Sequence, residues 1–274
     1  MAITKRRAWR FLIMGSTLRR DGFDATELSH DAFLGGRLVI AQPKVGYRAG
    51  VDPVLLAASV PARAGERVLD LGCGGGVAGL CLAARVPGLR LAGLEVQPVY
   101  ADLARRNAKA NDIALDVVTG DLSNMPDALR QQQFDHVIAN PPYFDRRQST
   151  AARDAGRERA MGEDLSLGDW VSAAARRVAQ KGCVTFIQRA ERLPDLMAAA
   201  AMHLGSLEVL PLIPRRGRAA RLVLLRGRKG GRAGFRLHDG WLLHEGPEHV
   251  QGGEKYTDLT DQVLRNAAAL SFPA

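Results

Sequence analysis

Cysteine and aromatic residues are scarce in this chain of 274 residues, and its N-terminal part has no long apolar run. The three cysteines form neither an even set nor a CxxC motif, which disfavours a disulfide framework and a structural zinc site. The longest apolar run near the start, Phe11 to Met14, is too short for a signal sequence or a membrane span. These absences predict a cytoplasmic protein with no metal and no membrane partner.

Acidic residues are missing from two segments, and this locates the net charge of +9. Residues 1–20 hold six basic residues and residues 215–236 hold nine, with no acid in either segment. In the rest of the chain 29 acids outnumber 23 basic residues, so the excess positive charge is confined to these two segments. Arginine clusters of this kind are typical of proteins that bind phosphate backbones, because each neutralised phosphate releases counterions. The alternative is a solvated surface with no ligand.

Apolar segments of strand length and helix length alternate along the middle of the chain. This alternation predicts an α/β fold with a doubly wound, mostly parallel sheet. Between Leu207 and His244 the strand-like runs are separated by turns, which predicts an antiparallel C-terminal edge with a basic connection. We expect one domain over residues 29–274 after a basic arm over residues 1–28. The predicted strands include 89–96, 115–119, 134–139 and 182–188, and the predicted helices include 98–111, 166–180, 192–203 and 258–270.

Two stretches, 68–76 and 134–144, are expected to open on one cleft. The first is a short apolar strand with an acid, followed by alternate glycines and a helical pattern. Glycine allows a left-handed backbone and close approach of a ligand, and the helix N-terminus beyond it offers free N–H groups. The second is another apolar strand, which ends in Asn-Pro-Pro-Tyr. Because open α/β sheets bind ligands at the carboxyl ends of their strands, both stretches should border the same site.

The segment before the glycine turn predicts a hairpin and a short helix. Residues 31–43 are typical of a hairpin or edge element that stops at Pro43. Asp52 precedes a proline and an apolar helical run over residues 54–60, so it suits the N-cap of that helix. A ligand role for Asp52 is equally compatible with the sequence. We interpret His136, inside an apolar strand, as a packed core residue.

The glycine spacing is compatible with two ligand classes. Gly74, Gly76 and Gly79 match GxGxxG, and Glu95 follows about 20 residues later, as in a dinucleotide fold. The fuller pattern, DxGxGxG over residues 70–76, resembles the first motif of the class I S-adenosylmethionine-dependent methyltransferases. The resemblance implies S-adenosyl-L-methionine as cofactor. Glu95 would accept hydrogen bonds from its ribose hydroxyls, and Asp121 would accept one from the amine of its adenine. The full set of implied cofactor contacts is Tyr47, Asp52, Asp70, Gly72, Gly74, Gly76, Glu95, Asp121 and Asn140.

The corner at residues 140–143 carries the predicted chemistry. An exocyclic amine or a side-chain amide is a poor nucleophile, because its lone pair is delocalised. The Asn140 side-chain oxygen and the Pro141 carbonyl can each accept one N–H, which draws the nitrogen towards tetrahedral geometry. The two prolines hold these acceptors in place, and Tyr143 can stack on a planar substrate. We therefore predict Asn140, Pro141 and Tyr143 as catalytic residues.

With this corner the chain resembles the amino-group methyltransferases, and among them most the bacterial tRNA(Val) adenine-N6 methyltransferase group. The likeness rests on Gly46-Tyr47-Arg48 with Val51-Asp52, on the corner through Phe144, and on Tyr256-Thr257 before the last helix. It implies methyl transfer to adenine N6 in the anticodon loop of a tRNA. The predicted substrate-binding residues are Pro142, Phe144, Arg146, Arg147, Arg215, Arg216 and Arg218.

Three other functions remain compatible with the sequence. A release-factor glutamine methyltransferase shares the corner, but it usually has a helical domain before the glycine turn, where this chain has strand-like and basic content. An rRNA guanine-N2 enzyme usually has phenylalanine at the position of Tyr143. An RNA-binding module could keep the cofactor fold without activity, although the intact corner argues against it.

Overall fold

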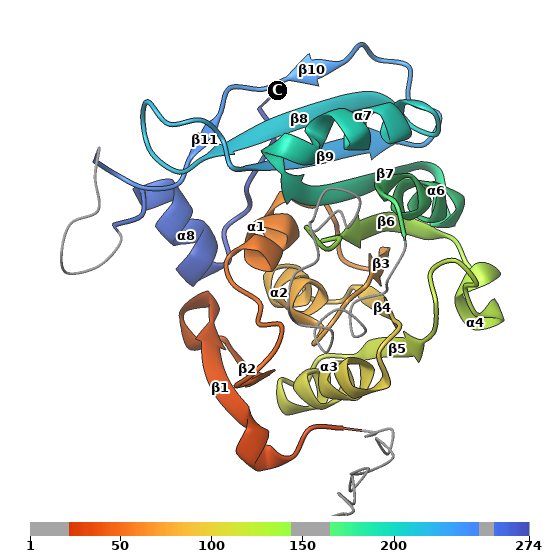
Figure 1. The fold of residues 1–274 in the computed structure, drawn as a ribbon, viewed down its shortest axis with the longest axis vertical. Coiled ribbons are helices and arrows are strands. Elements are labelled where there is room, and N and C mark those ends of the chain that lie inside the picture. The colour runs from red at the N-terminus through yellow and green to blue at the C-terminus, as the bar shows by residue number, and fades with distance from the viewer. Residues whose placement is uncertain (1–21, 144–164, 247–254, 274) are drawn as a thin grey trace, which may run out of the picture.

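The computed structural model describes residues 22–143, 165–246 and 255–273. Residues 1–21 of the predicted arm lie outside the described residues, as do the predicted substrate contacts Phe144, Arg146 and Arg147. In the described part, helices lie on both faces of one central sheet, and a separate hairpin lies beside it (Figure 1). The chain therefore has the expected doubly wound α/β fold.

Nine strands of the described residues form the central sheet. They are β3 (Arg67–Leu71), β4 (Arg90–Glu95), β5 (Leu115–Thr119), β6 (Phe134–Ala139), β7 (Val178–Arg189), β8 (Gly205–Ile213), β9 (Leu222–Arg228), β10 (Arg236–Leu237) and β11 (Trp241–Leu242). Their order is β10-β8-β9-β7-β6-β3-β4-β5, and β11 also pairs with β8. β5 and β6 have the predicted bounds, and β3, β4, β5, β6 and β7 all run parallel.

The C-terminal part of the sheet has the predicted antiparallel pairing, but the two short strands at its outer edge are parallel to their neighbour. β9 pairs antiparallel with β7 on one side and with β8 on the other, so it is inserted into the sheet. β10 and β11 pair parallel with β8. The antiparallel pairing does not continue beyond β8, because both edges of β9 are already occupied. The following segments must therefore use the free edge of β8, which they join in the parallel direction.

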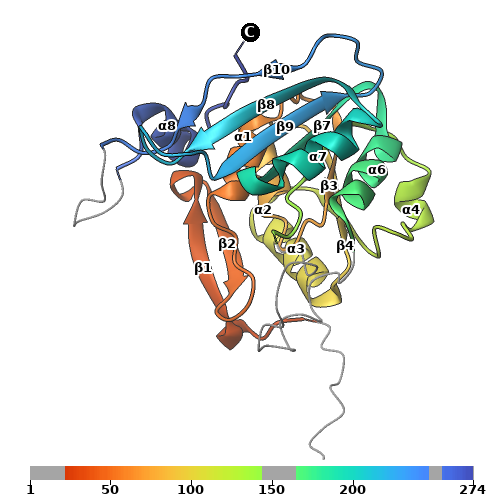
Figure 2. The ribbon, with the colours of Figure 1, turned by 45° about the horizontal axis from the view of Figure 1, so that its top comes forward.

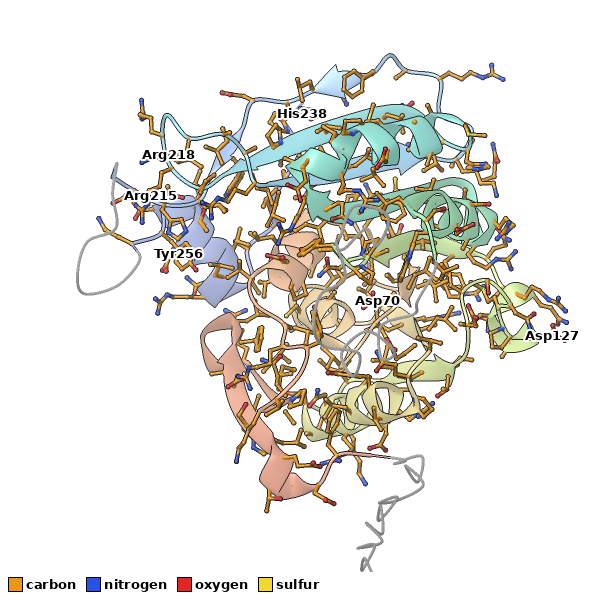
Figure 3. The ribbon with its side chains drawn as sticks, in the orientation of Figure 1. Asp70, Asp127, Arg215, Arg218, His238 and Tyr256 are labelled. Atoms are coloured by element: carbon orange, nitrogen blue, oxygen red, sulfur yellow. The ribbon has the colours of Figure 1, made fainter. Side chains whose placement is uncertain are left out.

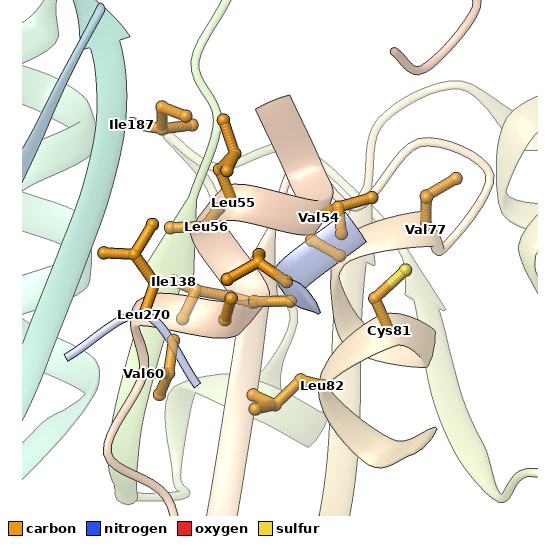
Figure 4. Packing of buried hydrophobic residues seen from close by; sticks show 14 of the residues in the cluster. Val54, Leu55, Leu56, Val60, Val77, Cys81, Leu82, Ile138, Ile187 and Leu270 are labelled. Carbon is orange, nitrogen blue, oxygen red and sulfur yellow. The ribbon is translucent and has the colours of Figure 1, made fainter. Parts of the chain in front are cut away.

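Successive apolar side chains of the strands point to opposite faces of the sheet, and helices cover both faces. On one face lie α1 (Asp52–Ser59), α2 (Val77–Arg85) and α8 (Asp258–Asn266), packed with residues such as Ile138 and Ile187 (Figure 4). On the other face lie α4 (Asp127–Arg130), α6 (Leu167–Arg177) and α7 (Leu193–Ala201), the last preceded by the 3-10 turn η4 (Ala190–Arg192). Parallel strands are normally buried on both faces, as observed here. In the described residues, no helix has both the length and the apolar character needed to cross a membrane.

Two predicted helices have different bounds: one ends earlier and the other starts earlier than the sequence suggested. α8 ends at Asn266 rather than at residue 270, because Ala267 adopts a left-handed conformation with φ of 57°. α1 begins at Asp52, and its N-cap is Val51. The prediction that Asp52 caps this helix was therefore wrong. His136 is buried in β6, as predicted, and its Nε2 lies 2.9 Å from Oε2 of Glu66.

The predicted hairpin is present and lies apart from the central sheet (Figure 2). It consists of β1 (Leu28–Phe33) and β2 (Leu38–Pro43), with the 3-10 turns η1 (Ala25–Glu27) before β1 and η2 (Leu34–Gly36) between the strands. The start of this folded part includes residues 22–28, which the sequence analysis assigned to the basic arm. Phe23 packs edge-on against Tyr100, with ring centroids 5.4 Å apart.

Two asparagines pair with the free edge of β2. Asn107 lies in α3 (Pro98–Ala110), and Asn111 is the C-cap residue of this helix. The Asn107 amide accepts from the Ala41 N–H at 2.8 Å and donates to the Ala41 carbonyl at 3.1 Å. Asn111 makes the same two bonds with Val39, both at 2.9 Å. Four residues rise about 6 Å along a helix and two residues about 7 Å along a strand, so the spacings match. These bonds fix the hairpin beside α3.

Candidate active site

The carboxyl ends of β3, β4, β5, β6 and β7 meet at one edge of the sheet, because these strands run parallel. The glycine turn follows β3, Glu95 ends β4, and Asp121 follows β5. The Asn140 corner follows β6. The structure therefore brings the predicted cofactor and catalytic residues of these strands to the same edge, as the sequence analysis expected.

The glycine turn has the backbone conformation that its glycines allow. Gly72, Gly74 and Gly76 have φ angles of 65°, 53° and 84°, in the left-handed region that other residues rarely adopt. A Cβ on Gly72 would come within 2.5 Å of the Trp170 ring, whereas a Cβ on Gly74 would meet only Tyr47, at 3.8 Å. The main chain at Gly74 is thus open on the side of Tyr47. A ligand can approach the backbone there, which fits a nucleoside or amino-acid group.

Two buried carboxylates support this turn. Oδ2 of Asp70 accepts from the Gly79 N–H at 3.2 Å and ties β3 to the first turn of α2. Glu95 accepts from the Gly74 N–H at 2.9 Å with one oxygen and from the Gln97 N–H at 2.8 Å with the other. Burial raises the pKa of Asp70 to about 7, against the opposing effect of the Gly79 N–H. Burial also raises the pKa of Glu95, although both N–H donors favour its charged form.

The two acids differ in what remains available for a ligand. Asp70 lies beneath the turn with 3% exposure, so its visible role is to shape the turn, and its cofactor contact stays a prediction. Each oxygen of Glu95 has one bonded N–H and a second acceptor position, which suits two ribose hydroxyls. Asp121 is exposed, and its Oδ1 accepts from the Ser123 N–H at 2.8 Å. With the open main chain at Gly74, this donor and acceptor set fits S-adenosylmethionine.

Tyr47 and Arg48 are adjacent in sequence, but their side chains point to different parts of the structure. Tyr47 is 46% exposed, and its backbone N–H donates to the Tyr100 hydroxyl at 3.1 Å. Arg48 turns away and forms an ion pair with Asp31 of the hairpin at 2.7 Å. Arg48 therefore locks the segment to the hairpin, and Tyr47 is left at the open side of the glycine turn.

The corner is held from α1 and from the end of β7. The Tyr143 hydroxyl donates to Oδ2 of Asp52, so Asp52 joins the corner to the start of α1. Burial and the neighbouring Asp52 carboxylate raise the pKa of the Tyr143 hydroxyl, which therefore remains a proton donor. The Arg189 guanidinium lies 5.3 Å from the centroid of the Tyr143 ring. One face of this ring already has a cationic neighbour, and a planar substrate would use the other face or replace Arg189.

Several residues at this edge were not found by sequence reasoning. Gln188 and Arg189 are polar residues at the carboxyl end of the apolar strand β7, and this strand-end position was a usable signal. The Gln188 Nε2 donates to the Pro141 carbonyl at 3.4 Å. Trp170 of α6 covers Gly72, and no pattern in the sequence placed α6 above the turn. Asn107 donates to the Gly75 carbonyl at 2.9 Å, in addition to its bonds with β2.

The basic segment 215–236 is divided between the two edges of the sheet. β9 runs opposite to β7, so the loop that enters β9 lies at the same edge as the corner, and the loop that leaves it lies at the opposite edge. Arg216 and Arg218 are exposed in the first loop. In the second loop the Lys229 carbonyl accepts from the Lys181 N–H at 3.1 Å, near the start of β7. Figure 3 shows Arg215 and Arg218 together near Tyr256, far from Asp127.

Arg215 does not fit the substrate-binding role predicted for it. Its side chain is 8% exposed, and its Nη1 donates to the Glu245 carbonyl at 2.6 Å. A guanidinium so placed holds the chain before α8 to the loop after β8. Sequence reasoning treated all arginines of the segment alike, because their burial depends on the C-terminal residues that pack over the loop.

The fold and this edge define a class I S-adenosylmethionine-dependent methyltransferase. The model of the family described as "Methyltransferase small domain" matches residues 39–157 of this chain. A tRNA1(Val) (adenine(37)-N6)-methyltransferase of Porphyromonas gingivalis is 33% identical over 186 residues, which cover 63% of this chain and 71% of that relative. A protein of the same name from Actinobacillus succinogenes is 30% identical over 200 residues, with 71% and 82% covered. The chain belongs to the tRNA1(Val) (adenine(37)-N6)-methyltransferase family.

A similar solved structure supports the same fold. It is a protein of Agrobacterium tumefaciens described as a "predicted O-methyltransferase", with 27% identity and a TM-score of 0.65. The match covers 81% of this chain and 100% of that chain.

Proposed function

We propose that this protein transfers a methyl group from S-adenosylmethionine to N6 of an adenine in the anticodon loop of a tRNA(Val). The observation that carries the proposal is the position of the Asn140 corner, directly after β6 and at the same edge as the glycine turn. The names of the relatives support the substrate class. A function of this kind is expected in the cytoplasm, where tRNA is matured.

Within this proposal the glycine turn and its neighbours hold the cofactor. The residues for this task are Tyr47, Gly72, Gly74, Gly76, Glu95 and Asp121. Bound there, S-adenosylmethionine supplies an electrophilic methyl group on a sulfonium. Trp170 closes the turn at Gly72 and limits the approach of water from the side of α6.

The corner prepares the nitrogen that receives the methyl group. The Asn140 side-chain oxygen and the Pro141 carbonyl each accept one N–H of the adenine N6 amine, so that its lone pair is directed out of the base plane. No strong base is needed, because the nitrogen becomes acidic only after transfer, and its proton can then leave to water. Catalysis by such a site depends mainly on positioning, for which several kcal/mol is a reasonable order.

An oxygen acceptor, as in the name of the Agrobacterium tumefaciens protein, is less well supported. A hydroxyl has one proton, whereas the corner offers two neighbouring hydrogen-bond acceptors, which match an NH₂ group. A guanine-N2 or glutamine side-chain substrate also has an NH₂ group, so the corner alone does not exclude these alternatives. The relatives and the exposed Arg216 and Arg218 at the site edge favour a tRNA.

The direct experiment is to incubate the protein with labelled S-adenosylmethionine and unmodified tRNA(Val), and to digest the product to nucleosides. We expect N6-methyladenosine with the wild-type protein and none with Asn140→Ala, whose cofactor affinity should stay within a few-fold. A tRNA with guanosine in place of the target adenine should bind but accept no methyl group. Methylation of a release factor with no reaction on tRNA would contradict the substrate, and an active Asn140→Ala would contradict the role of the corner.

A further inference from the structure

We propose that Gln188 is a positioning residue that orients the Pro141 carbonyl towards the target amine. This inference rests on the proposed function, in which that carbonyl accepts one N–H of the amine. Gln188 lies near the carboxyl end of β7, next to β6, which leads into the corner. Its side chain is fully buried, with 0% exposure.

Both ends of the Gln188 amide have a partner, and this settles its orientation. Oε1 accepts from the Arg189 backbone N–H at 2.8 Å. Because an N–H can only be accepted by the oxygen end, the NH₂ end must face the Pro141 carbonyl, to which Nε2 donates at 3.4 Å. The side chain is thus fixed by its own strand and points its donor at the corner.

The corner has a specific need for such a donor. Neither Pro141 nor Pro142 has an N–H, so backbone donors of the corner cannot tie these two residues to the fold. The proline ring fixes φ of Pro141, and Pro142 after it limits ψ to the extended region, within which the carbonyl can still turn by about 40°. A donor on the carbonyl itself is therefore the direct way to restrain this angle.

The bond to Gln188 still leaves the carbonyl free to act. A carbonyl oxygen has two lone pairs, so one can accept from Gln188 while the other accepts from the substrate. The separation of 3.4 Å is long for an N–H···O bond, so it occupies this acceptor only weakly. The neighbouring buried residues of the strand, Phe186 and Ile187, are apolar, and a buried amide is explained here by the carbonyl that it faces.

The test compares Gln188→Leu with the wild type in methyl transfer to unmodified tRNA(Val). We expect kcat to fall about 10- to 100-fold, because a displacement of about 1 Å at a reacting group can cost this much. The cofactor Kd and the KM for tRNA should stay within about 3-fold, because the Gln188 side chain is fully buried behind the corner. The matched control is Thr185→Val, which removes a fully buried hydroxyl from the same strand and should leave kcat within 2-fold.

A second variant, Gln188→Glu, gives a readout that a role in packing alone would not move. A protonated glutamate can donate to the Pro141 carbonyl, whereas an ionised one has only acceptors and repels it. The ratio of the kcat of this variant to that of the wild type should therefore rise several-fold when the pH is lowered from 8.5 to 6. If Gln188→Leu does not fold, as judged by its Tm, this pH dependence decides.

The outcomes separate this inference from the proposed function. A kcat of Gln188→Leu close to that of the wild type, beside an inactive Asn140→Ala, overturns the role of Gln188 and leaves the proposed function intact. The role of Gln188 is also overturned if the kcat of Gln188→Glu relative to the wild type does not change with pH. Absence of any transfer by the wild type, or full activity of Asn140→Ala, overturns the proposed function itself.

Discussion

Glu95 holds the glycine turn, and we propose that it also binds the cofactor. Both of its oxygens accept backbone N–H bonds, at Gly74 and at Gln97, so its carboxylate is fixed before any ligand arrives. A fixed acceptor loses little freedom on binding. Its contribution to cofactor affinity should therefore be large for a single side chain.

We predict that Glu95→Ala weakens binding of S-adenosylmethionine and S-adenosylhomocysteine by about 30- to 1000-fold. The physical reason is the loss of two hydrogen bonds to a charged group, at roughly 2 to 4 kcal/mol in total. Isothermal titration calorimetry measures both affinities directly. Asp121→Ala, at an exposed position, should have a smaller effect. Unchanged affinity of Glu95→Ala would show that the ribose contact is assigned to the wrong acid.

Asp70 predicts a pH dependence of stability. Burial raises its pKa in the folded protein to about 7, whereas the unfolded chain should have an ordinary value near 3.9. Between these two values the folded state binds more protons than the unfolded state, so this group lowers stability as the pH rises through the interval. The effect is complete above pH 7 and amounts to about 4 kcal/mol at most.

The variant Asp70→Asn removes this titration and keeps an oxygen that can accept from the Gly79 N–H. We therefore expect the Tm of the variant, relative to the wild type, to be higher at pH 8 than at pH 5. Scanning calorimetry of the ligand-free protein at both pH values gives the comparison. An equal Tm difference at pH 5 and pH 8 would mean that Asp70 has the same pKa in both states.

At the scale of elements, α3 joins the hairpin to the cofactor turn. Asn107 is 1% exposed and bonds both to Ala41 of β2 and to the Gly75 carbonyl, whereas Asn111 bonds to Val39 in a more exposed position. The two asparagines make similar bonds to the strand edge, but only Asn107 reaches the glycine turn. They form a matched pair for testing whether the hairpin and the turn are coupled.

We predict that Asn107→Ala lowers the free energy of unfolding by about 2 to 4 kcal/mol, because it leaves buried backbone groups without partners. Cofactor affinity should fall as well, since the turn loses a restraint at Gly75. Asn111→Ala should cost about 1 kcal/mol or less and leave cofactor affinity unchanged. Urea denaturation and calorimetry provide the two measurements. If both variants bind the cofactor equally well, the asparagine ladder serves only the stability of the hairpin.

At the scale of the whole molecule, the fold divides one basic segment into two surfaces. Arg216 and Arg218 lie in the loop between β8 and β9, at the edge that carries the corner. β9 lies two strands from β6, which is about 10 Å across the sheet. Lys181 and Arg232 lie at the opposite edge, and both are exposed. An RNA bound at the corner therefore lies nearer to the first pair than to the second.

We predict that replacing Arg216 and Arg218 together by alanine weakens tRNA binding and reduces its dependence on salt by about 1 to 2 units of slope. Replacing Lys181 and Arg232 removes the same charge and should change neither quantity by much. Filter binding between 50 and 200 mM salt measures both, and cofactor affinity should be the same in all proteins. Equal effects of the two double variants would show that only net charge matters, and no effect of either would make the first loop a solvated surface.

The sequence alone determined the local features of this protein. The left-handed glycines, the acids at strand ends, and the corner after β6 were all predicted, because each depends on residues adjacent in the chain. The strands 115–119 and 134–139 were also correct, since an apolar run bounded by polar residues or glycine defines both ends. A mostly parallel sheet followed from the alternation of strands and helices.

The tertiary structure decided which distant residues meet. The bond between Asp52 and Tyr143, the burial of Arg215 under the Glu245 carbonyl, and the donor of Gln188 at Pro141 each join segments far apart in the chain. They depend on strand order and direction, above all on the insertion of β9 between β7 and β8. Local patterns contain no information on that insertion, because it is selected by the burial of both faces and both edges of the sheet at once.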